Sequence, residues 1–382
     1  MEHIGKPPFE VDRLYSLMEQ FEVELLLAST RHNIRYLTGG YYYPLYVWDS
    51  HGRRTQYLSF ACIPRQAVED SFYVGRPGEK EVMQEADVWM KQCYESEKIG
   101  SLWTAARTVE VLKSRRLDGS RIAVELPSLP ADVFEVLKER LPRAVFVDAV
   151  PMMDALRAVK SADEIAIIRE GTKRNLEAVA AVLRSGRDGV STAELADRVA
   201  REFRDRELHF LYALVCAGPG FFRAPSEKRR WRHGNLLHVD AGGLFESYVV
   251  ELCRVGYLGK PSGLADELLQ GCRDLEEQVL GTLRPGVEAG VVQRSADTFL
   301  EKHPLGKYGR FIAHGIGLVH HEDPVIDARS PQLLQEGMVL SIEMEFRHEE
   351  AGHVKLEDMA VITGGGSELL GPRQEAWYIS EG

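Results

Sequence analysis

Two stretches in the C-terminal half of the chain resemble each other. LRSGRDGVSTAELADRVAREF begins at Leu183 and LRPGVEAGVVQRSADTFLEKH begins at Leu283; each follows a long helical pattern, passes a glycine-containing turn and enters a shorter helix. This matching order indicates an internal duplication. Two such halves would place their strands in one curved antiparallel sheet with the helices outside. The expected strands are residues 210–218, 235–243 and 248–259 in the first half and residues 311–321, 337–346 and 352–362 in the second.

The N-terminal part of the chain has a different pattern, in which strand-like and helix-like segments alternate as in a small α/β domain. A capping box of Ser161 and Glu164 then opens a long helix, and a second one pairs Ser191 with Glu194. We therefore predict an α/β (α+β) protein with domains at residues 1–155 and 156–382. In the first domain we expect strands at 23–29, 33–40, 55–63, 121–126 and 144–149, and helices at 105–115 and 130–141.

Composition narrows the classes of protein to consider. The 382 residues are 44% hydrophobic and 27% charged, as in globular proteins, and the length suits two domains. A formal net charge of -11 without clustered basic residues argues against nucleic acid as a partner. The five cysteines form no CxxC motif, which predicts reduced thiols and a cytoplasmic location. The N-terminus lacks a signal-peptide pattern, and no apolar run predicts a membrane span.

Acidic residues interrupt strands that otherwise look buried. Alternation of side chains places Glu343 on one face of its strand and Glu357 on the face that it shares with Lys355. Asp240 and Glu251 lie in equally apolar segments. One such acid is usually a solvated edge residue or half of an ion pair, but four together need more positive charge than nearby Lys355 and Arg254 supply.

A metal ion would neutralise all four acids at once, and His314 offers an imidazole to the same cluster. One imidazole with four carboxylates suits a divalent transition metal such as Mn, Co, Fe or Zn. Four carboxylates are also enough to bridge two ions. The sequence therefore predicts a metal site built on strands of the second domain.

These segments resemble the motifs of a known family. HGIGLVHHEDP, residues 314–324, closely resembles the H-G-[IV]-G-L-x-x-H-E-x-P motif of the pita-bread family, which comprises prolidase, aminopeptidase P, methionine aminopeptidase and creatinase. GMVLSIEMEF, VKLEDMAVIT and HVDAGGLFESYVVELCR resemble its G-M-V-x-x-I-E-P, R-x-E-D-x-x-x-V-T and D-x-G-x(8)-D-x-T-R patterns. The resemblance spans almost the whole chain. It implies a creatinase-like N-terminal domain and a pita-bread C-terminal domain.

The resemblance also implies roles for individual residues. Carried over position by position, a water activated between two metal ions is the nucleophile, a carboxylate, Glu343, takes its proton, and His321 contacts the substrate carbonyl or oxyanion. Two further candidates come from this sequence itself: His320 as a catalytic and substrate-facing group, and Arg223 as a substrate contact. The aromatic segment 41–49 either faces substrate or simply packs on the surface. The implied metal ligands are Asp240, Glu251, His314, Glu343 and Glu357.

Four positions depart from the family pattern. Position 251 is Glu where the metallopeptidases have Asp, and Ser226 follows Pro225 where the family has a substrate-contacting His. His320 replaces an apolar residue, and Lys355 replaces an Arg. Creatinase shares the fold and works without metal, so the fold alone does not imply metal.

Our main interpretation is a metal-dependent hydrolase of an amide or related C–N bond, similar to Xaa-Pro dipeptidases and aminopeptidases. It would act on a short peptide or small molecule and form a homodimer, with no nucleic-acid or membrane partner. One alternative is a non-peptidase enzyme on the same fold, either a creatinase-like amidinohydrolase or a lyase. The other is a catalytically inactive binding module.

Overall fold

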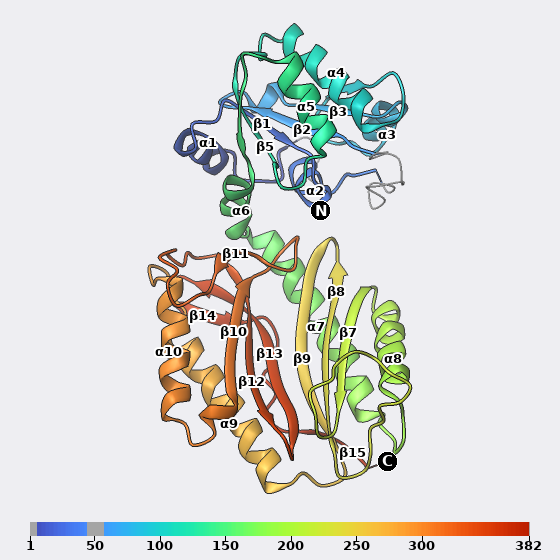
Figure 1. Cartoon of the computed structure of the whole chain (residues 1–382), viewed down its shortest axis with the longest axis vertical. Coiled ribbons are helices and arrows are strands. Elements are labelled where there is room, and N and C mark those ends of the chain that lie inside the picture. Colours follow the sequence, from blue (N-terminus) through green and yellow to red (C-terminus); the bar gives the residue numbers. More distant parts are fainter. Residues whose placement is uncertain (1–5, 44–56, 382) are drawn as a thin grey trace. The chain divides into compact units, whose positions relative to one another are not determined.

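The chain forms two compact units, Met1–Leu156 and Arg157–Gly382, and a computed structural model describes residues 6–43 and 57–381 (Figure 1). The second unit carries the acidic strands. Residues 44–49 of the aromatic segment lie outside the described residues. Among the helices of the described residues, none combines the length and the apolar composition that a membrane span requires.

The N-terminal unit is a six-stranded mixed sheet in the order β4-β3-β2-β1-β5-β6 with helices beside it. Strand β1 pairs antiparallel with β2 and parallel with β5. Its strands are β1 Leu25–Ala28, β2 Phe60–Pro64, β3 Phe72–Gly75, β4 Gln92–Glu95, β5 Arg121–Val124 and β6 Val145–Asp148. Its helices are α1 Val11–Gln20, α2 Arg31–Thr38, η2 Val68–Asp70, α3 Glu79–Glu85, α4 Ser101–Ser114 and α5 Ala131–Arg140, and α6 Val150–Ala158 leads into the second unit.

One predicted strand of this unit is wrong, because residues 33–40 contribute to helix α2 instead. Gly39 ends the helix at a φ of 84°, a left-handed conformation that glycine adopts without strain. At the other end, buried Glu125 accepts hydrogen bonds from the backbone N–H of Thr30 at 2.7 Å and from the side chain of Asn33 at 2.6 Å. This acid therefore satisfies helix-end donors from a distant strand terminus, which local sequence cannot reveal.

The C-terminal unit is a nine-stranded sheet in the order β11-β10-β12-β13-β9-β8-β7, with β14 beside β13 and β15 beside β9. Its strands are β7 His209–Ala217, β8 Leu236–Phe245, β9 Tyr248–Leu258, β10 Gly309–Gly315, β11 Glu322–Val325, β12 Val339–His348, β13 Gly352–Thr363, β14 Gly366–Leu369 and β15 Tyr378–Ser380. Its helices are α7 Ala162–Arg184, α8 Thr192–Asp205, α9 Gly263–Leu280, α10 Ala289–Lys302 and η3 Gly306–Tyr308.

The predicted duplication is confirmed by this topology. Each half supplies two helices and then three main strands: α7, α8 and β7–β9 in the first, and α9, α10, β10, β12 and β13 in the second. The halves meet where β9 pairs with β13, and the strand order is mirrored about that seam. The result is the curved antiparallel sheet expected from the sequence.

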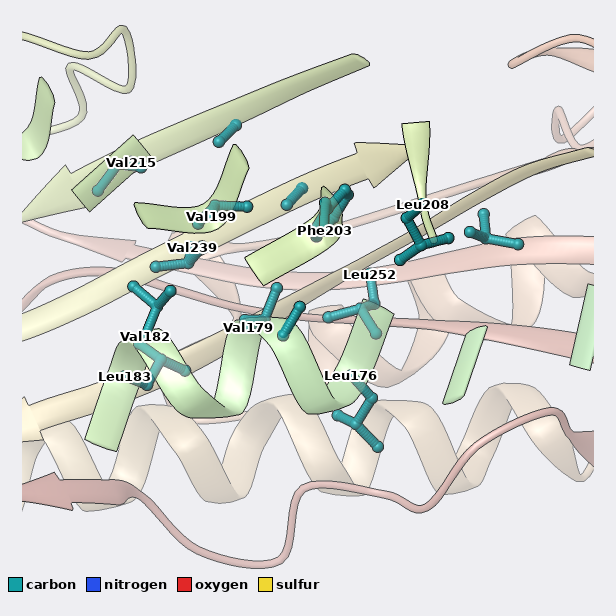
Figure 2. Packing of buried hydrophobic residues seen from close by; sticks show 14 of the residues in the cluster. Leu176, Val179, Val182, Leu183, Val199, Phe203, Leu208, Val215, Val239 and Leu252 are labelled. Atoms are coloured by element: carbon teal, nitrogen blue, oxygen red, sulfur yellow. The ribbon is translucent and has the colours of Figure 1, made fainter. Parts of the chain in front are cut away.

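Helix α7 anchors the first half on its sheet. Ser161 and Glu164 make the predicted capping box at its start. Apolar side chains along the helix then pack against β7, β8, β9 and α8 (Figure 2). Burial of each such side chain contributes about 1.5–3 kcal/mol. The labelled members of this cluster are Leu176, Val179, Val182, Leu183, Val199, Phe203, Leu208, Val215, Val239 and Leu252.

Two local predictions need correction. At α8, Ser191 accepts the hydrogen bond from the Glu194 backbone, but the Glu194 carboxylate pairs with Arg198 at 2.7 Å instead of closing the box. The strand expected at 311–321 ends at Gly315. The pairing of β10 with β11 shifts register between His314 and Gly315, and a Cβ at Gly315 would lie 2.1 Å from the backbone oxygen of Asp323, which explains why this last position of the strand is glycine.

Candidate metal centre

One row of residues crosses four neighbouring strands of the C-terminal sheet. Glu343 on β12 lies opposite Glu357 on β13. Glu357 also lies opposite Cys253 on β9, and Cys253 pairs with Asp240 on β8. Because directly paired residues of antiparallel strands point to the same face, three carboxylates meet here. We call this surface of the sheet the site face.

Glu251 and His314 complete the group. Glu251 precedes Cys253 by two residues on β9, so strand alternation turns it to the site face as well. His314 on β10 pairs with Ser341 of β12, next to Glu343 on that face. The structure therefore brings together all five residues that the resemblance implied as ligands.

These groups are withdrawn from solvent. Asp240 and Glu357 are each 2% exposed and Glu251 is 1% exposed, while the Glu343 side chain is 13% exposed. Burial, with the nearby charge of Glu357, raises the pKa of Asp240 and raises that of Glu251 well above its ordinary value. Burial also raises the pKa of Glu357. Clustered carboxylates in such a place are costly unless positive charge accompanies them.

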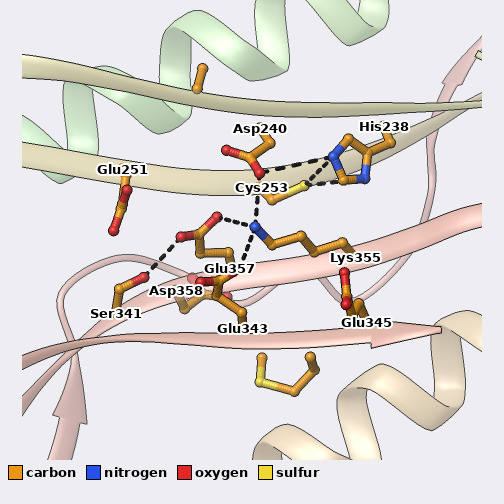
Figure 3. A network of polar contacts seen from close by, with 12 residues as sticks. His238, Asp240, Glu251, Cys253, Ser341, Glu343, Glu345, Lys355, Glu357 and Asp358 are labelled. Atoms are coloured by element: carbon orange, nitrogen blue, oxygen red, sulfur yellow. Dashed lines mark hydrogen bonds and ion pairs between the residues drawn. The ribbon is translucent and has the colours of Figure 1, made fainter. Parts of the chain in front are cut away.

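Lys355 provides part of that charge from the middle of the group (Figure 3). Its Nζ lies 2.5 Å from Glu343 Oε2, 2.8 Å from Asp240 Oδ2 and 2.9 Å from Glu357 Oε2. Burial opposes the charge of this amine, but the three carboxylates outweigh it and raise the pKa of Lys355 well above its ordinary value. The side chain is 3% exposed, so this ammonium is an internal part of the site.

Arg223 provides a second positive charge, as its Nη1 lies 3.0 Å from Asp240 Oδ2. It approaches from the segment between β7 and β8, where the backbone N–H of Ser226 donates to Thr192 Oγ1 at 3.0 Å and Ser226 Oγ accepts from the backbone N–H of Lys228 at 3.2 Å. Ser226 therefore does not stand in for the family's histidine. Arg254, which the sequence suggested as a second nearby cation for the acids, instead makes a bidentate pair with Asp358.

Glu251 is held by two neighbours. Tyr212 Oη donates to Glu251 Oε2 at 2.8 Å, and His320 Nε2 lies 2.7 Å from the same oxygen. The Tyr212 ring covers Gly242, where a Cβ would lie 2.4 Å from the ring. Oε1 of Glu251 is buried and accepts no hydrogen bond from any residue that the structure describes. It faces His314 Nε2 at 3.4 Å.

His314 is oriented for ligation. Its Nδ1 lies 3.0 Å from the backbone oxygen of Gly315, and since a carbonyl can only accept, Nδ1 carries the proton. The lone pair of Nε2 then points toward Glu251 and Glu343, as in histidine ligands fixed by an outer hydrogen bond. Burial lowers the pKa of His314 to about 4 and so favours the neutral ring.

The other two histidines of the stretch lie beside this ring. His321 is exposed and stacks on His314 with ring centroids 3.9 Å apart. His320 lies next to Tyr212 and Glu251, and burial lowers its pKa. Both histidines predicted to face substrate thus border the carboxylate group.

Sequence reasoning missed several neighbours of the site. Ser341 Oγ donates to Glu357 Oε1 at 2.9 Å, and its place two residues before Glu343 was the available signal. Buried His238, Asp240 and Cys253 offer donor atoms that all lie within 4.8 Å of one another. Within the N-terminal unit, Tyr41 of the aromatic segment donates to Glu79 at 2.9 Å.

The residues present fit a divalent transition metal. The donor set of oxygens and one neutral imidazole has the hard-to-borderline character that Mn, Co, Fe and Zn accept. The buried Glu251 Oε1 that accepts no hydrogen bond from the described residues lies beside the free lone pair of His314. Glu357 Oε2 is likewise buried, with Lys355 as its ionic neighbour.

Comparison with known proteins follows the same division of the chain. Residues 166–364 match metallopeptidase family M24, and residues 11–159 match the Creatinase/Prolidase N-terminal domain. The uncharacterized peptidase YqhT of Bacillus subtilis is 24% identical over 371 residues, which cover 94% of this chain and 97% of that protein. The Xaa-Pro dipeptidase of Pyrococcus horikoshii is 25% identical over 248 residues, 64% of this chain and 71% of that protein.

Solved structures show the same fold. The Xaa-Pro dipeptidase from Bacillus anthracis superposes with a TM-score of 0.80 at 19% identity, over 97% of this chain and 98% of that one. Identity at this level supports the fold and no finer property. Together with the family match across the C-terminal unit, these findings show that the chain belongs to metallopeptidase family M24 and carries a Creatinase/Prolidase N-terminal domain.

Proposed function

We propose that the chain is a metal-dependent hydrolase that cleaves short peptides of the Xaa-Pro type. The observation that carries the proposal is the convergence of four carboxylates and His314 on one sheet face with Lys355 as their buried cation. The peptidase family and the Xaa-Pro dipeptidases among its relatives support the reaction class. Asp240, Glu251, His314, Glu343 and Glu357 would hold the metal.

A bound divalent transition metal supplies a Lewis acid and lowers the pKa of a nearby water. Glu343, the most accessible of the four acids, would accept the proton from the attacking water. His321 would donate a hydrogen bond to the substrate carbonyl as negative charge develops on it. His320 would keep Glu251 in place and border the substrate, and Arg223 would meet the polar end of the substrate from the opposite segment.

A specific observation favours a second candidate, a non-peptidase enzyme such as a creatinase-like amidinohydrolase or a lyase. Lys355 and Arg223 both contact Asp240, and Ser226 leaves the site without the family's second substrate-contacting histidine. These two positively charged side chains would lie beside a substrate other than a dipeptide.

One experiment separates these two functions. The purified protein, loaded with Mn²⁺, is offered a panel of Xaa-Pro dipeptides beside guanidino and betaine-type compounds, and metal content is measured in parallel. Hydrolysis of Xaa-Pro dipeptides with metal bound is the expected result. Turnover of only the guanidino or betaine-type compounds would establish the second candidate. Metal-free protein without turnover of either class would favour an inactive binding module.

We further propose manganese as the resident ion, a homodimer and a cytoplasmic location. The oxygen-rich donor set supports manganese, and five free cysteines, four of them buried, support a reducing compartment. Light scattering at micromolar concentration should give twice the mass of one chain, and a monomer would contradict the dimer. Cell fractionation tests the location.

A further inference from the structure

The turn between β10 and β11 carries both histidines that are predicted to face substrate, and its backbone is fixed at its start. Ile316 N–H donates to Val339 O at 3.2 Å, and Gly317 O accepts from Val249 N–H at 2.7 Å. Over residues 318–321, no backbone N–H donates a hydrogen bond within the part of the chain that the structure describes. The far end of the turn therefore depends on other contacts.

Glu322, the residue after His321, provides such a contact through two buried cations. Lys160 Nζ lies 2.7 Å from Glu322 Oε1, and Arg157 Nε lies 3.3 Å from Glu322 Oε2. All three side chains are at most 3% exposed. Charge-assisted hydrogen bonds are stronger and more directional in such a buried place than in water. The two contacts therefore fix the direction of the carboxylate as well as its position.

The two cations are themselves fixed to the sheet of the second unit. Arg157 lies at the end of α6, and Lys160 follows it by three residues. The Lys160 backbone N–H donates to Gly337 O at 2.9 Å, and Val159 forms a bridge with Met338 directly before β12. The position of the Glu322 carboxylate is therefore set by the same sheet that carries the acids of the candidate metal centre.

The Glu322 carboxylate also lies against the start of the turn. A Cβ at Gly317 would lie 2.3 Å from Glu322 Oε1 and 3.0 Å from Lys160 Cε, so only glycine allows this approach. Because Glu322 directly follows His321, one carboxylate secures both ends of the turn. The ring of His321 stacks on that of His314 with centroids 3.9 Å apart. The place of this ring over the site thus depends on how the turn is held.

We propose that Glu322 is a positioning residue that holds His321 in place for catalysis. Its ion pairs with Lys160 and Arg157 fix the turn, and the fixed turn keeps the His321 ring over His314. The inference rests on the proposed function, in which His321 donates a hydrogen bond to the substrate carbonyl. A purely structural ion pair would instead change the free energy of unfolding and leave the turnover of the folded enzyme unchanged.

The test is a double-mutant cycle between Glu322→Gln and His321→Ala in the full-length, Mn²⁺-loaded protein. We expect Glu322→Gln alone to lower kcat and kcat/KM for an Xaa-Pro dipeptide by about 10²-fold, as misplacement of a catalytic group by about 1 Å does, with unchanged metal content. In the His321→Ala background, the same substitution should lower kcat/KM by about twofold at most, because effects that pass through one residue are not additive. The matched control is Glu276→Gln, which changes another buried acid that contacts an arginine, on α9, and it should leave kcat/KM unchanged.

A crystal structure of Glu322→Gln gives a second readout that does not depend on activity, namely the separation of the His321 and His314 rings. We expect this separation to exceed 3.9 Å between centroids. Unmoved rings, or losses in kcat/KM that add in the double variant, would overturn the inference. A wild type without Xaa-Pro turnover would reject the proposed function, and the ring separation would then decide the inference alone. If Glu322→Gln does not fold, Lys160→Met removes one of the two contacts and gives the same two readouts.

Discussion

Adjacent residues of β9 and β13 point to opposite faces of one sheet, and the two faces treat buried charge differently. On the face that packs against α9, the buried Asp358 carboxylate receives two hydrogen bonds from Arg254, at 2.5 and 3.1 Å. Nearby Glu276 of α9 receives one from Arg373 at 2.6 Å. Two acids thus meet two arginines, and each arginine has a carboxylate of its own.

On the site face, one residue away along each strand, four carboxylates share one buried lysine and the half-buried Arg223. Glu251 here and Glu276 on the other face each keep a buried oxygen that accepts no hydrogen bond from the described residues, so the two faces differ in the number of cations for each carboxylate. This difference between the faces separates structural from functional buried charges. Balanced ion pairs stabilise the packing of α9 on the sheet, whereas the excess of carboxylates on the site face needs a further cation. The predictions below act on one face and then on the other.

Removing metal should have the largest effect, and only on the site face. We expect dialysis against a chelator to abolish hydrolysis completely, because the carboxylate excess then lacks its cation, and we expect Mn²⁺ to restore it. Activity and metal content are measured before and after. Full activity in protein shown to be metal-free would remove the functional distinction between the faces.

Arg254→Ala should have the largest effect on the other face. Breaking a fully buried pair from one side leaves the Asp358 charge uncompensated and costs about 3–5 kcal/mol of unfolding free energy, measured by urea denaturation. Arg107→Ala, which removes an exposed i,i+3 pair with Glu110, is the matched control and should change stability by at most about 0.5 kcal/mol. Equal small losses in both variants would show that Arg254 carries no special structural weight.

The histidines of the site should divide into two classes. His314→Ala is expected to lose metal, because it removes the imidazole whose lone pair faces Glu251 and Glu343. His321→Ala should keep metal and slow turnover by about 10²–10³-fold, the usual cost of one oxyanion donor. Metal analysis and steady-state kinetics are compared for the two variants. The same loss of metal in both would refute separate roles for the stacked rings.

The sheet of the second unit could be predicted because its strands show a regular alternation of side chains and its two halves repeat in sequence. Acidic residues inside apolar strands made a carboxylate group inferable from the sequence, but only the register of β12 and β13 shows that Glu343 and Glu357 lie opposite each other on one face. The helix at 31–38 could not, because its N-terminal donors are satisfied by Glu125, a residue about ninety positions away. The helix and strand propensities of residues 31–38 carry no information about such a distant partner.

The partners within the site were equally hidden. Lys355 was visible as a nearby cation, but only the pairing of β8, β9, β12 and β13 shows that its amine lies among three carboxylates. Arg254 is next to Cys253 in sequence and was expected to supply positive charge to the acids, yet strand alternation turns it to the opposite face, where it pairs with Asp358. Tyr212 reaches Glu251 across Gly242, a contact that depends on strand register between β7 and β8.

The smallest expected effect concerns Glu276 and tests whether the buried charges on the α9 face are balanced. Burial, and next the charge of Asp358, raises the pKa of Glu276 to about 8 despite its contact with Arg373. A carboxyl whose folded pKa is raised contributes fully to stability below its unfolded pKa, near 4.3, and that contribution is lost as pH rises through about 8. Wild-type stability should therefore fall relative to Glu276→Gln across this window, by at most ~1.4 kcal/mol per pH unit for one proton. Urea denaturation at several pH values between 4.5 and 8.5 measures the difference, with the exposed neighbour variant Glu277→Gln as the control.

A constant difference would mean that Glu276 is ionised throughout and that the two acids and two arginines form fully charged pairs. A difference that grows with pH would mean that Glu276 holds its proton near neutrality. Even on its structural face, the sheet would then keep a buried carboxyl neutral where positive charge is insufficient, and the charged excess on the site face would be the exception that a metal ion explains.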